Sequence, residues 1–238
     1  MPDHIMKAYD DDLAALQSML STMGGLAEEQ LARSVEALTR RDTKLADIVI
    51  HADDRIDQME RAVEEKAILT IAKRQPMAKD LRNIMVAIRI ATDLERIGDL
   101  AKNVAKRSHA ISDPIPRRLT SGLQRMGQLA QAQLKRVLDS FAAADSEQAM
   151  EVWRHDEDID ALYNSIFREL LTYMMEDPRM IGACTHLLFA TKNIERIGDH
   201  ATNIAENIYY LVHGQPIRDE RPKKDDTATT PFSPLNND

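Results

Sequence analysis

Residues 94–105 read Leu-Glu-Arg-Ile-Gly-Asp-Leu-Ala-Lys-Asn-Val-Ala, and residues 194–205 read Ile-Glu-Arg-Ile-Gly-Asp-His-Ala-Thr-Asn-Ile-Ala. The Glu-Arg-Ile-Gly-Asp core is identical in the two copies, and the spacing of the residues after it is kept. A segment that recurs after about one hundred residues indicates a duplicated unit. The sequence therefore predicts a chain made of two related halves.

The repeated segment has the pattern of a helix with an unfavourable pair of charges. Small and apolar residues recur at steps of three and four, which is the helical period. Glu95 and Asp99 are four residues apart, so they are neighbours on one helix face and repel each other. Gly98 between them costs the helix about 1 kcal/mol relative to alanine. Two compensating roles remain open: the carboxylates bind a cation, or the glycine allows close helix packing.

Composition narrows the class of protein. The chain has 238 residues, low aromatic content and a net charge of −8, which favours a helical protein and excludes nucleic acid as a partner. The only cysteine, Cys184, excludes an internal disulfide and suits a reducing compartment. No stretch is typical of a signal peptide or of a membrane span, so we expect a cytoplasmic protein.

Breakers and capping residues predict three helices in the first half. They cover about 7–41, 42–74 with Asp42 as N-cap, and 76–109 after the turn at Pro76. In the second half, Asp145 corresponds to Asp42, and Pro178 corresponds to Pro76. The predicted fold is therefore all-α, with six helices arranged as two tandem three-helix bundles.

The predicted boundaries follow from the strongest breaker. The stretch Asp113-Pro114-Ile115-Pro116 is expected to join the two bundles, which gives domains 1–110 and 111–214. Residues 215–238 are rich in Pro, Asp, Lys, Thr and Asn and have few apolar side chains. This composition predicts a disordered C-terminal tail.

A second pair of acids faces the first motif. Asp57 and Glu95 lie on opposite sides of Pro76 at the same sequence distance from it. Asp53 and Asp99 also lie on opposite sides of Pro76 at equal distances from it. At about 1.5 Å of rise per residue, both pairs stand roughly 28–35 Å along their antiparallel helices. Closing the hairpin would therefore bring four carboxylates together in the first half.

The second half repeats this arrangement around Pro178. Asp160 and Glu195 lie at nearly equal sequence distances from this proline, on opposite sides of it, and so do Asp156 and Asp199. Four carboxylates at such short distances from one another do not all stay ionised unless positive charge compensates them. Cations that prefer oxygen ligands commonly supply that charge. Helix salt bridges with neighbouring arginines and lysines, or solvated acidic faces, are the alternatives.

The sequence offers no sign of catalysis. It lacks a glycine-rich phosphate loop and a Ser/His/Asp set for nucleophilic chemistry, so we predict no catalytic and no cofactor-binding residues. The Glu-x-x-His pattern of ferritin-like di-iron sites is also absent. A metal-dependent hydrolase or oxidase on a helical bundle is the alternative in the enzyme class, and a purely structural scaffold is a third reading.

The chain resembles the PhoU family over about residues 4–213. The resemblance depends on His4-Ile5 followed by an acidic stretch and Leu13, on the Met-Gly-x-Leu-Ala pattern at 23–27, and on both Glu-Arg-Ile-Gly-Asp copies. It implies two three-helix bundles related by pseudo-twofold symmetry. It also implies a cytoplasmic, non-enzymatic negative regulator of the phosphate-starvation response that restrains phosphate uptake. Such a protein works between the phosphate-specific ABC transporter and a membrane sensor histidine kinase.

The resemblance further implies a set of metal ligands. Members of the family carry acidic motifs that bind multinuclear clusters, of iron, zinc, manganese or magnesium, although metal-free members are known. The exposed bundle faces favour a homodimer. Two of the four motifs begin with Asp in place of Glu, which shortens the reach of their ligands. Carried over by position, the ligands are Asp53, Asp57, Glu95, Asp99, Asp156, Asp160, Glu195 and Asp199.

Overall fold

The computed structural model describes residues 2–111, 115–219 and 221, with side chains from residue 8 onward. These residues form seven α-helices and two short 3-10 helices, and none of them forms a strand. The elements are α1 (Pro2–Arg40), α2 (Thr43–Arg74), α3 (Lys79–Lys106), η1 (Arg107–His109), α4 (Arg117–Ala143), α5 (Ser146–Arg154), α6 (Glu157–Glu176), η2 (Pro178–Met180) and α7 (Ile181–His213).

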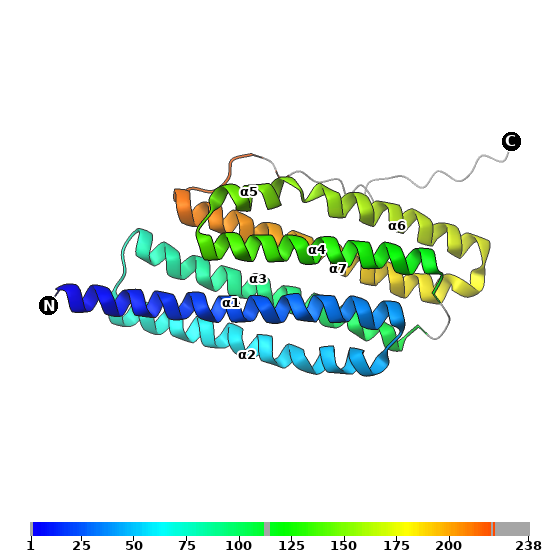
Figure 1. Cartoon of the computed structure of the whole chain (residues 1–238), viewed down its shortest axis with the longest axis horizontal. Helices are drawn as coiled ribbons and strands as arrows, with labels where there is room; N and C mark the ends of the chain where they lie inside the picture. Colours follow the sequence, from blue (N-terminus) through cyan, green and yellow to red (C-terminus); the bar gives the residue numbers. More distant parts are fainter. Residues whose placement is uncertain (1, 112–114, 220, 222–238) are drawn as a thin grey trace.

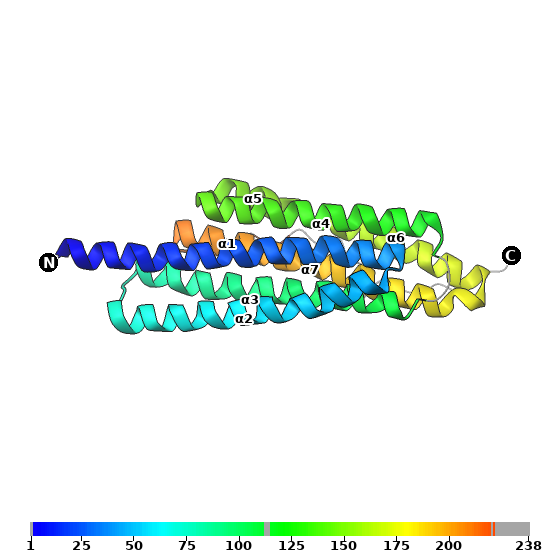
Figure 2. The same ribbon diagram turned by 60° about the horizontal axis from the view of Figure 1, so that its bottom comes forward.

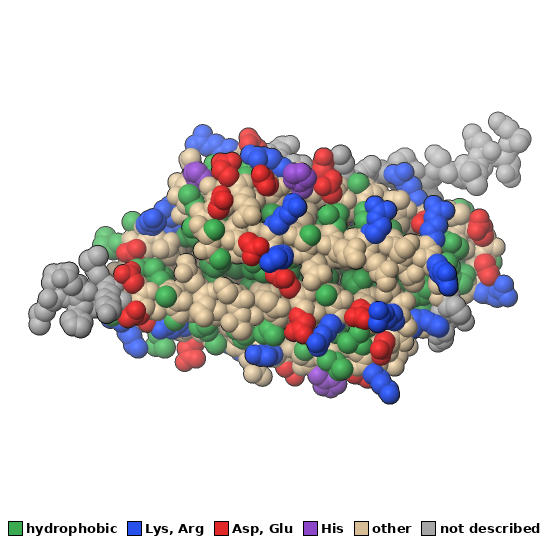
Figure 3. Space-filling model, in the orientation of Figure 1, with side chains coloured by type: hydrophobic (Ala, Val, Ile, Leu, Met, Phe, Trp, Pro, Cys, Tyr) green, Lys and Arg blue, Asp and Glu red, His purple; other side chains and the backbone are tan. Residues whose placement is uncertain are grey.

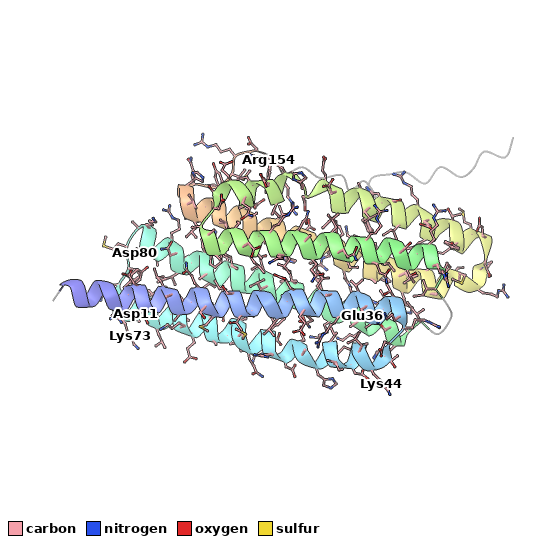
Figure 4. All side chains as sticks on the ribbon, in the orientation of Figure 1. Asp11, Glu36, Lys44, Lys73, Asp80 and Arg154 are labelled. Atoms are coloured by element: carbon pink, nitrogen blue, oxygen red, sulfur yellow. The ribbon has the colours of Figure 1, made fainter. Side chains whose placement is uncertain are left out.

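The helices form two antiparallel bundles that lie side by side (Figure 1). The first bundle contains α1, α2 and α3, and the second contains α4, α7 and the pair α5–α6. The bundles contact each other mainly through α3 with α7 and α1 with α4, and Figure 2 shows α1 between α4 and α2. Asp11, Lys73 and Asp80 lie at one end of the first bundle, and Glu36 and Lys44 lie at the other (Figure 4). The predicted fold of two three-helix bundles is confirmed.

Capping residues explain where the helices begin and end. Asp42 precedes α2 and accepts a hydrogen bond from the Leu45 backbone N–H at 3.0 Å, as the sequence predicts. Asp145 caps α5 in the same way. Gly214 ends α7 in the left-handed region, at φ 75°, where a residue without Cβ is favoured. The repeated caps show that the two halves share one folding plan.

The sequence predicts one continuous fifth helix after Asp145, and this prediction is wrong because the helix is interrupted. The chain leaves the helix at His155 and Asp156, so that α5 and α6 replace one long helix. The His155 carbonyl accepts from the Gln133 side chain of α4 at 3.0 Å and from the Asp158 N–H at 3.2 Å, and the Ile159 N–H bonds to the Asp156 carbonyl. At this point the bonds between residues four apart are thus replaced by bonds between residues three apart and by one bond from a side chain. In the first half, Gln30 donates to the Val49 carbonyl, and α2 remains continuous.

Two expected segments fall mainly outside the described residues. The predicted joint at Asp113-Pro114 lies within 112–114, which the structure does not describe. The predicted disordered tail concerns chiefly residue 220 and residues 222–238, which are also outside it. The described part of that tail, residues 215–219 and Arg221, packs on the second bundle, and Ile217 contacts the hydrophobic core. The division into domains at 110 and 214 stays a prediction.

One continuous hydrophobic core runs through both bundles. The repeated motif supplies matching members in each half, because Leu94 and Ile97 are fully buried, as are Ile194 and Ile197. Acidic and basic side chains are mixed over the visible face (Figure 3). Among the described helices, none combines the length and the apolar character that a membrane crossing requires.

The contact between α1 and α4 depends on a small residue. A Cβ at Gly127 of α4 would lie 2.8 Å from Cγ2 of Val35 in α1, and Val35 is stiff because it is branched at Cβ. A Cβ at Gly25 would meet no atom within 4 Å. Gly127 therefore allows the two bundles to approach closely.

Gly127→Ala is expected to lower the free energy of unfolding by about 1 kcal/mol. Overpacking at Val35 costs about 1–3 kcal/mol, and the gain in helix propensity offsets about 1 kcal/mol of that cost. Gly25→Ala is the matched control and is expected to raise the free energy of unfolding, because it gains the propensity without a clash. Urea denaturation of the two variants measures the difference. Equal stabilisation of both would mean that α1 and α4 are not closely packed at Gly127.

Candidate functional site

The first acidic cluster consists of Asp53 and Asp57 of α2 and Glu95 and Asp99 of α3. The antiparallel helices place Asp53 and Asp99 on one lysine, Lys102, and place Asp57 and Glu95 near enough to Asp99 for its charge to act on both. Burial and the neighbouring Asp53 carboxylate raise the pKa of Asp57. Burial, with further contributions from Asp99 and Asp57, raises the pKa of Glu95 above its ordinary value. The predicted four-carboxylate patch is therefore present in the first bundle.

A lysine neutralises much of this cluster. Lys102, one turn after Asp99 on α3, forms ion pairs with Asp53 Oδ2 and, at 3.0 Å, with Asp99 Oδ1. Asp53 is 1% exposed, and its Oδ1 accepts a hydrogen bond from Gln30 at 3.1 Å. The Arg96 guanidinium lies 3.4 Å from Glu95 Oε2 and is mostly exposed. The salt-bridge interpretation of these acids thus describes their present contacts.

The second acidic cluster consists of Asp156, Asp160, Glu195 and Asp199, from the start of α6 and the middle of α7. It is more deeply buried than the first, since Asp156 is 2%, Asp160 3% and Glu195 3% exposed. Arg221 bridges the cluster by donating to Asp156 Oδ2 and to Asp199 Oδ1, each at 2.8 Å. The hairpin between α6 and α7 therefore assembles a second patch of four carboxylates.

Glu195 is the most perturbed acid of the cluster. Burial raises its pKa from 4.5 to about 7, and the charges of Asp199 and Asp160 act in the same direction. Lys192 opposes this by donating to Glu195 Oε1 at 2.9 Å. The other oxygen, Oε2, is buried and accepts no hydrogen bond from the described residues. A carboxylate in this state has an unused strong acceptor inside the protein.

The two clusters obtain their bridging cations from different places. Lys102 follows the first Glu-Arg-Ile-Gly-Asp copy by three residues, and Thr202 holds the corresponding position after the second. Thr202 donates to Asp156 Oδ1 at 2.9 Å but carries no charge. Arg221 supplies the missing positive charge from beyond the repeat. The internal symmetry of the chain is thus broken at its two charged sites.

The donor chemistry of the clusters fits a hard cation. Every candidate ligand is a carboxylate. The buried Oε2 of Glu195 accepts no hydrogen bond from the described residues, and the buried Oε2 of Glu95 accepts none either and has the Arg96 guanidinium at 3.4 Å as an ion-pair partner. As these side chains stand, no three Asp, Glu, His or Cys residues within 8–111, 115–219 and 221 are gathered around one metal position. The eight acids therefore remain predicted metal ligands, and binding would require local rearrangement of the ion pairs.

Sequence reasoning missed three members of these sites. Lys192 lies three residues before Glu195, a spacing that was readable as a helix ion pair. Arg221 was the second missed residue. Thr202 stands where the first half has Lys102, and this absence of a positive charge was a signal that another residue supplies it. Gln133, which donates to the His155 carbonyl at the break between α5 and α6, had no such signal, because this contact depends on packing between α4 and α5.

Comparison with known proteins places this geometry in a family. A PhoU domain model matches residues 20–108 and 123–208, which includes both Glu-Arg-Ile-Gly-Asp copies. The chain is 59% identical over 227 residues to the phosphate-specific transport system accessory protein PhoU homolog of Rhizobium meliloti (strain 1021), which covers 95% of this chain and 96% of that protein. The homolog of Caulobacter vibrioides (strain NA1000 / CB15N) is 50% identical over 226 residues, 94% of this chain and 98% of that protein.

Solved structures agree with these matches. The crystal structure of PhoU from Pseudomonas aeruginosa superimposes with a TM-score of 0.83 at 41% identity, covering 87% of this chain and 100% of that one. The phosphate transport system regulatory protein PhoU from Streptococcus pneumoniae superimposes with a TM-score of 0.82 at 27% identity, covering 88% of this chain and 99% of that one. With the doubled motif, the paired bundles and these relatives in agreement, the chain belongs to the PhoU family.

Proposed function

We propose that this protein is a regulatory accessory component of phosphate-specific transport, without catalytic activity of its own. Family membership supports this role, because its relatives are named as accessory proteins of the phosphate-specific transport system. The single observation that carries the proposal is the Glu-Arg-Ile-Gly-Asp motif, present twice and assembled into an acidic cluster in each bundle. Neither cluster contains a histidine or a nucleophile, so metal-dependent hydrolysis or oxidation receives no support from the site residues.

The finer proposal concerns partners and direction of control. The protein is a cytoplasmic negative regulator of the phosphate-starvation response, and it restrains phosphate uptake. It acts between the phosphate-specific ABC transporter and a membrane sensor histidine kinase, as a homodimer. The long helical faces with mixed charges are suited to docking onto proteins rather than to enclosing a substrate.

Deleting the gene is expected to activate a phosphate-starvation promoter when phosphate is plentiful. The physical reason is that the accessory protein holds the kinase and transporter in their phosphate-replete state, and this restraint is lost without it. A promoter–reporter assay in high phosphate measures the change. Re-expression of the wild-type protein is the control and is expected to return the reporter activity to its low level. A promoter that stays silent in the deletion strain would remove the negative regulatory role.

Divalent or trivalent metal, as a multinuclear cluster of iron, zinc, manganese or magnesium, is the proposed cofactor of the acidic clusters. Glu95→Gln combined with Glu195→Gln is expected to lower the metal content, because each loses a buried carboxylate oxygen that has no hydrogen-bond donor among the described residues. Elemental analysis after gentle purification measures it. The control pair, Glu64→Gln with Glu151→Gln, changes the charge equally at exposed positions. Equal metal content in both variants would remove Glu95 and Glu195 from the ligand set.

A further inference from the structure

The C-terminal segment contacts the second acidic cluster through Arg221. After Gly214 the chain leaves α7 in the left-handed conformation and turns back over the second bundle (Figure 1). Ile217 packs against the hydrophobic core, and Arg221 then enters the cluster with only 17% of its side chain exposed. The segment therefore has an apolar anchor followed, four residues later, by a buried charge.

The length of the segment matches the distance it has to cover. Asp199 lies fifteen residues before Gly214 on α7, which corresponds to about 22 Å of helix. Arg221 lies seven residues after Gly214, and seven residues span at most about 23–25 Å between Cα atoms. An extended segment together with the long arginine side chain therefore reaches back to Asp199.

The contacts of Arg221 are specific to a guanidinium. Its Nε donates to Asp156 and its Nη2 donates to Asp199, so the planar group uses two different nitrogens to join α6 and α7. Asp156 is 2% exposed, and a buried carboxylate without its partner is costly. In the first cluster Lys102 makes the equivalent bridge from within the repeat. The second cluster is instead bridged by a group from the segment that follows α7.

We propose that the second acidic cluster is an arginine-binding site that the C-terminal segment fills through Arg221, and that this arginine and a divalent cation compete for the same carboxylates. The proposal builds on the metal-binding role proposed above. Glu195 lies one helical turn before Asp199 on α7 and is 3% exposed, and its buried Oε2 accepts no hydrogen bond from the described residues, so the cluster holds a further acceptor for a cation once Arg221 releases Asp156 and Asp199. The bridging cation of the first cluster, Lys102, belongs to α3 itself, so the two halves respond differently to the same metal ion.

Manganese binding tests the competition. Calorimetric titration with MnCl2 is compared for the full-length wild-type chain, Arg221→Gln and Arg218→Gln, where Arg218 is an exposed arginine of the same segment. Arg221→Gln is expected to bind manganese about tenfold more tightly, a common size for coupling between two ligands, and Arg218→Gln is expected to match the wild type. Adding Glu195→Gln to Arg221→Gln is expected to abolish the gain, which assigns it to the second cluster.

Limited proteolysis gives a second measurement that needs no substitution. In the wild-type chain, manganese is expected to speed tryptic cleavage after the exposed Arg218, because the cation displaces Arg221 and frees the segment. Equal manganese affinity in the wild type and Arg221→Gln, or a cleavage rate that does not respond to bound manganese, would overturn the competition and leave the metal-binding proposal intact. Absence of manganese binding in every variant would overturn both proposals.

Discussion

Replacing Lys102 with methionine is expected to lower the free energy of unfolding by about 3–5 kcal/mol. Lys102 is the cation that pairs with Asp53, and Asp53 is 1% exposed. Methionine keeps most of the length and apolar character of the side chain but removes the charge. The carboxylate of Asp53 would then be buried with the Gln30 amide as its remaining donor. Urea denaturation at neutral pH, in the presence of a chelator, measures the loss.

Two further variants separate this effect from a general loss of packing. Asp53→Asn combined with Lys102→Met is expected to recover much of the stability, because no uncompensated charge remains in the interior. Arg96→Met removes a cation that pairs with Glu95 and Asp99 from a side chain that is 56% exposed, and is expected to cost less than about 1 kcal/mol. Losses of equal size in Lys102→Met and Arg96→Met would show that the buried pair with Asp53 is not a major source of stability.

The repeat made most of the fold predictable. Helix period, capping aspartates and the prolines at the turns are local signals, and the structure follows them at Asp42, Asp145 and the two hairpin turns. The spacing of the acids around Pro76 and Pro178 also predicted which carboxylates meet, because the rise of a helix converts sequence distance into height. Both acidic clusters were therefore accessible from the sequence.

What could not be predicted depends on contacts between distant elements. The break between α5 and α6 lies where Gln133 of α4 donates to the His155 carbonyl, and no local pattern at His155 predicts it. Arg221 lies in a stretch whose composition is typical of disorder, and its burial depends on two carboxylates contributed by other helices. A short stretch of sequence indicates only the local helix propensity. The helix break at His155 and the burial of Arg221 depend on hydrogen bonds and ion pairs with residues far away in the sequence.

Burial makes Glu195 a source of pH-dependent stability. Its pKa is about 7 in the folded chain against an ordinary value of 4.5, so folding favours the protonated carboxyl. The stabilising contribution of the protonated form is complete below pH 4.5 and is lost as the pH rises to about 7. Glu95 and Asp57 have raised pKa values as well and act with the same sign.

Glu195→Gln is therefore expected to gain stability relative to the wild type as the pH rises, by about 2–3 kcal/mol between pH 4.5 and pH 7. Glutamine keeps the shape of the side chain and still accepts from Lys192, but it has no charge to lose or gain. Urea denaturation of chelator-treated protein at several pH values across this window measures the difference. The exposed substitution Glu151→Gln is the control and should follow the wild type. A constant difference between Glu195→Gln and the wild type across the window would contradict the prediction, because the carboxyl would then titrate equally in the folded and unfolded states.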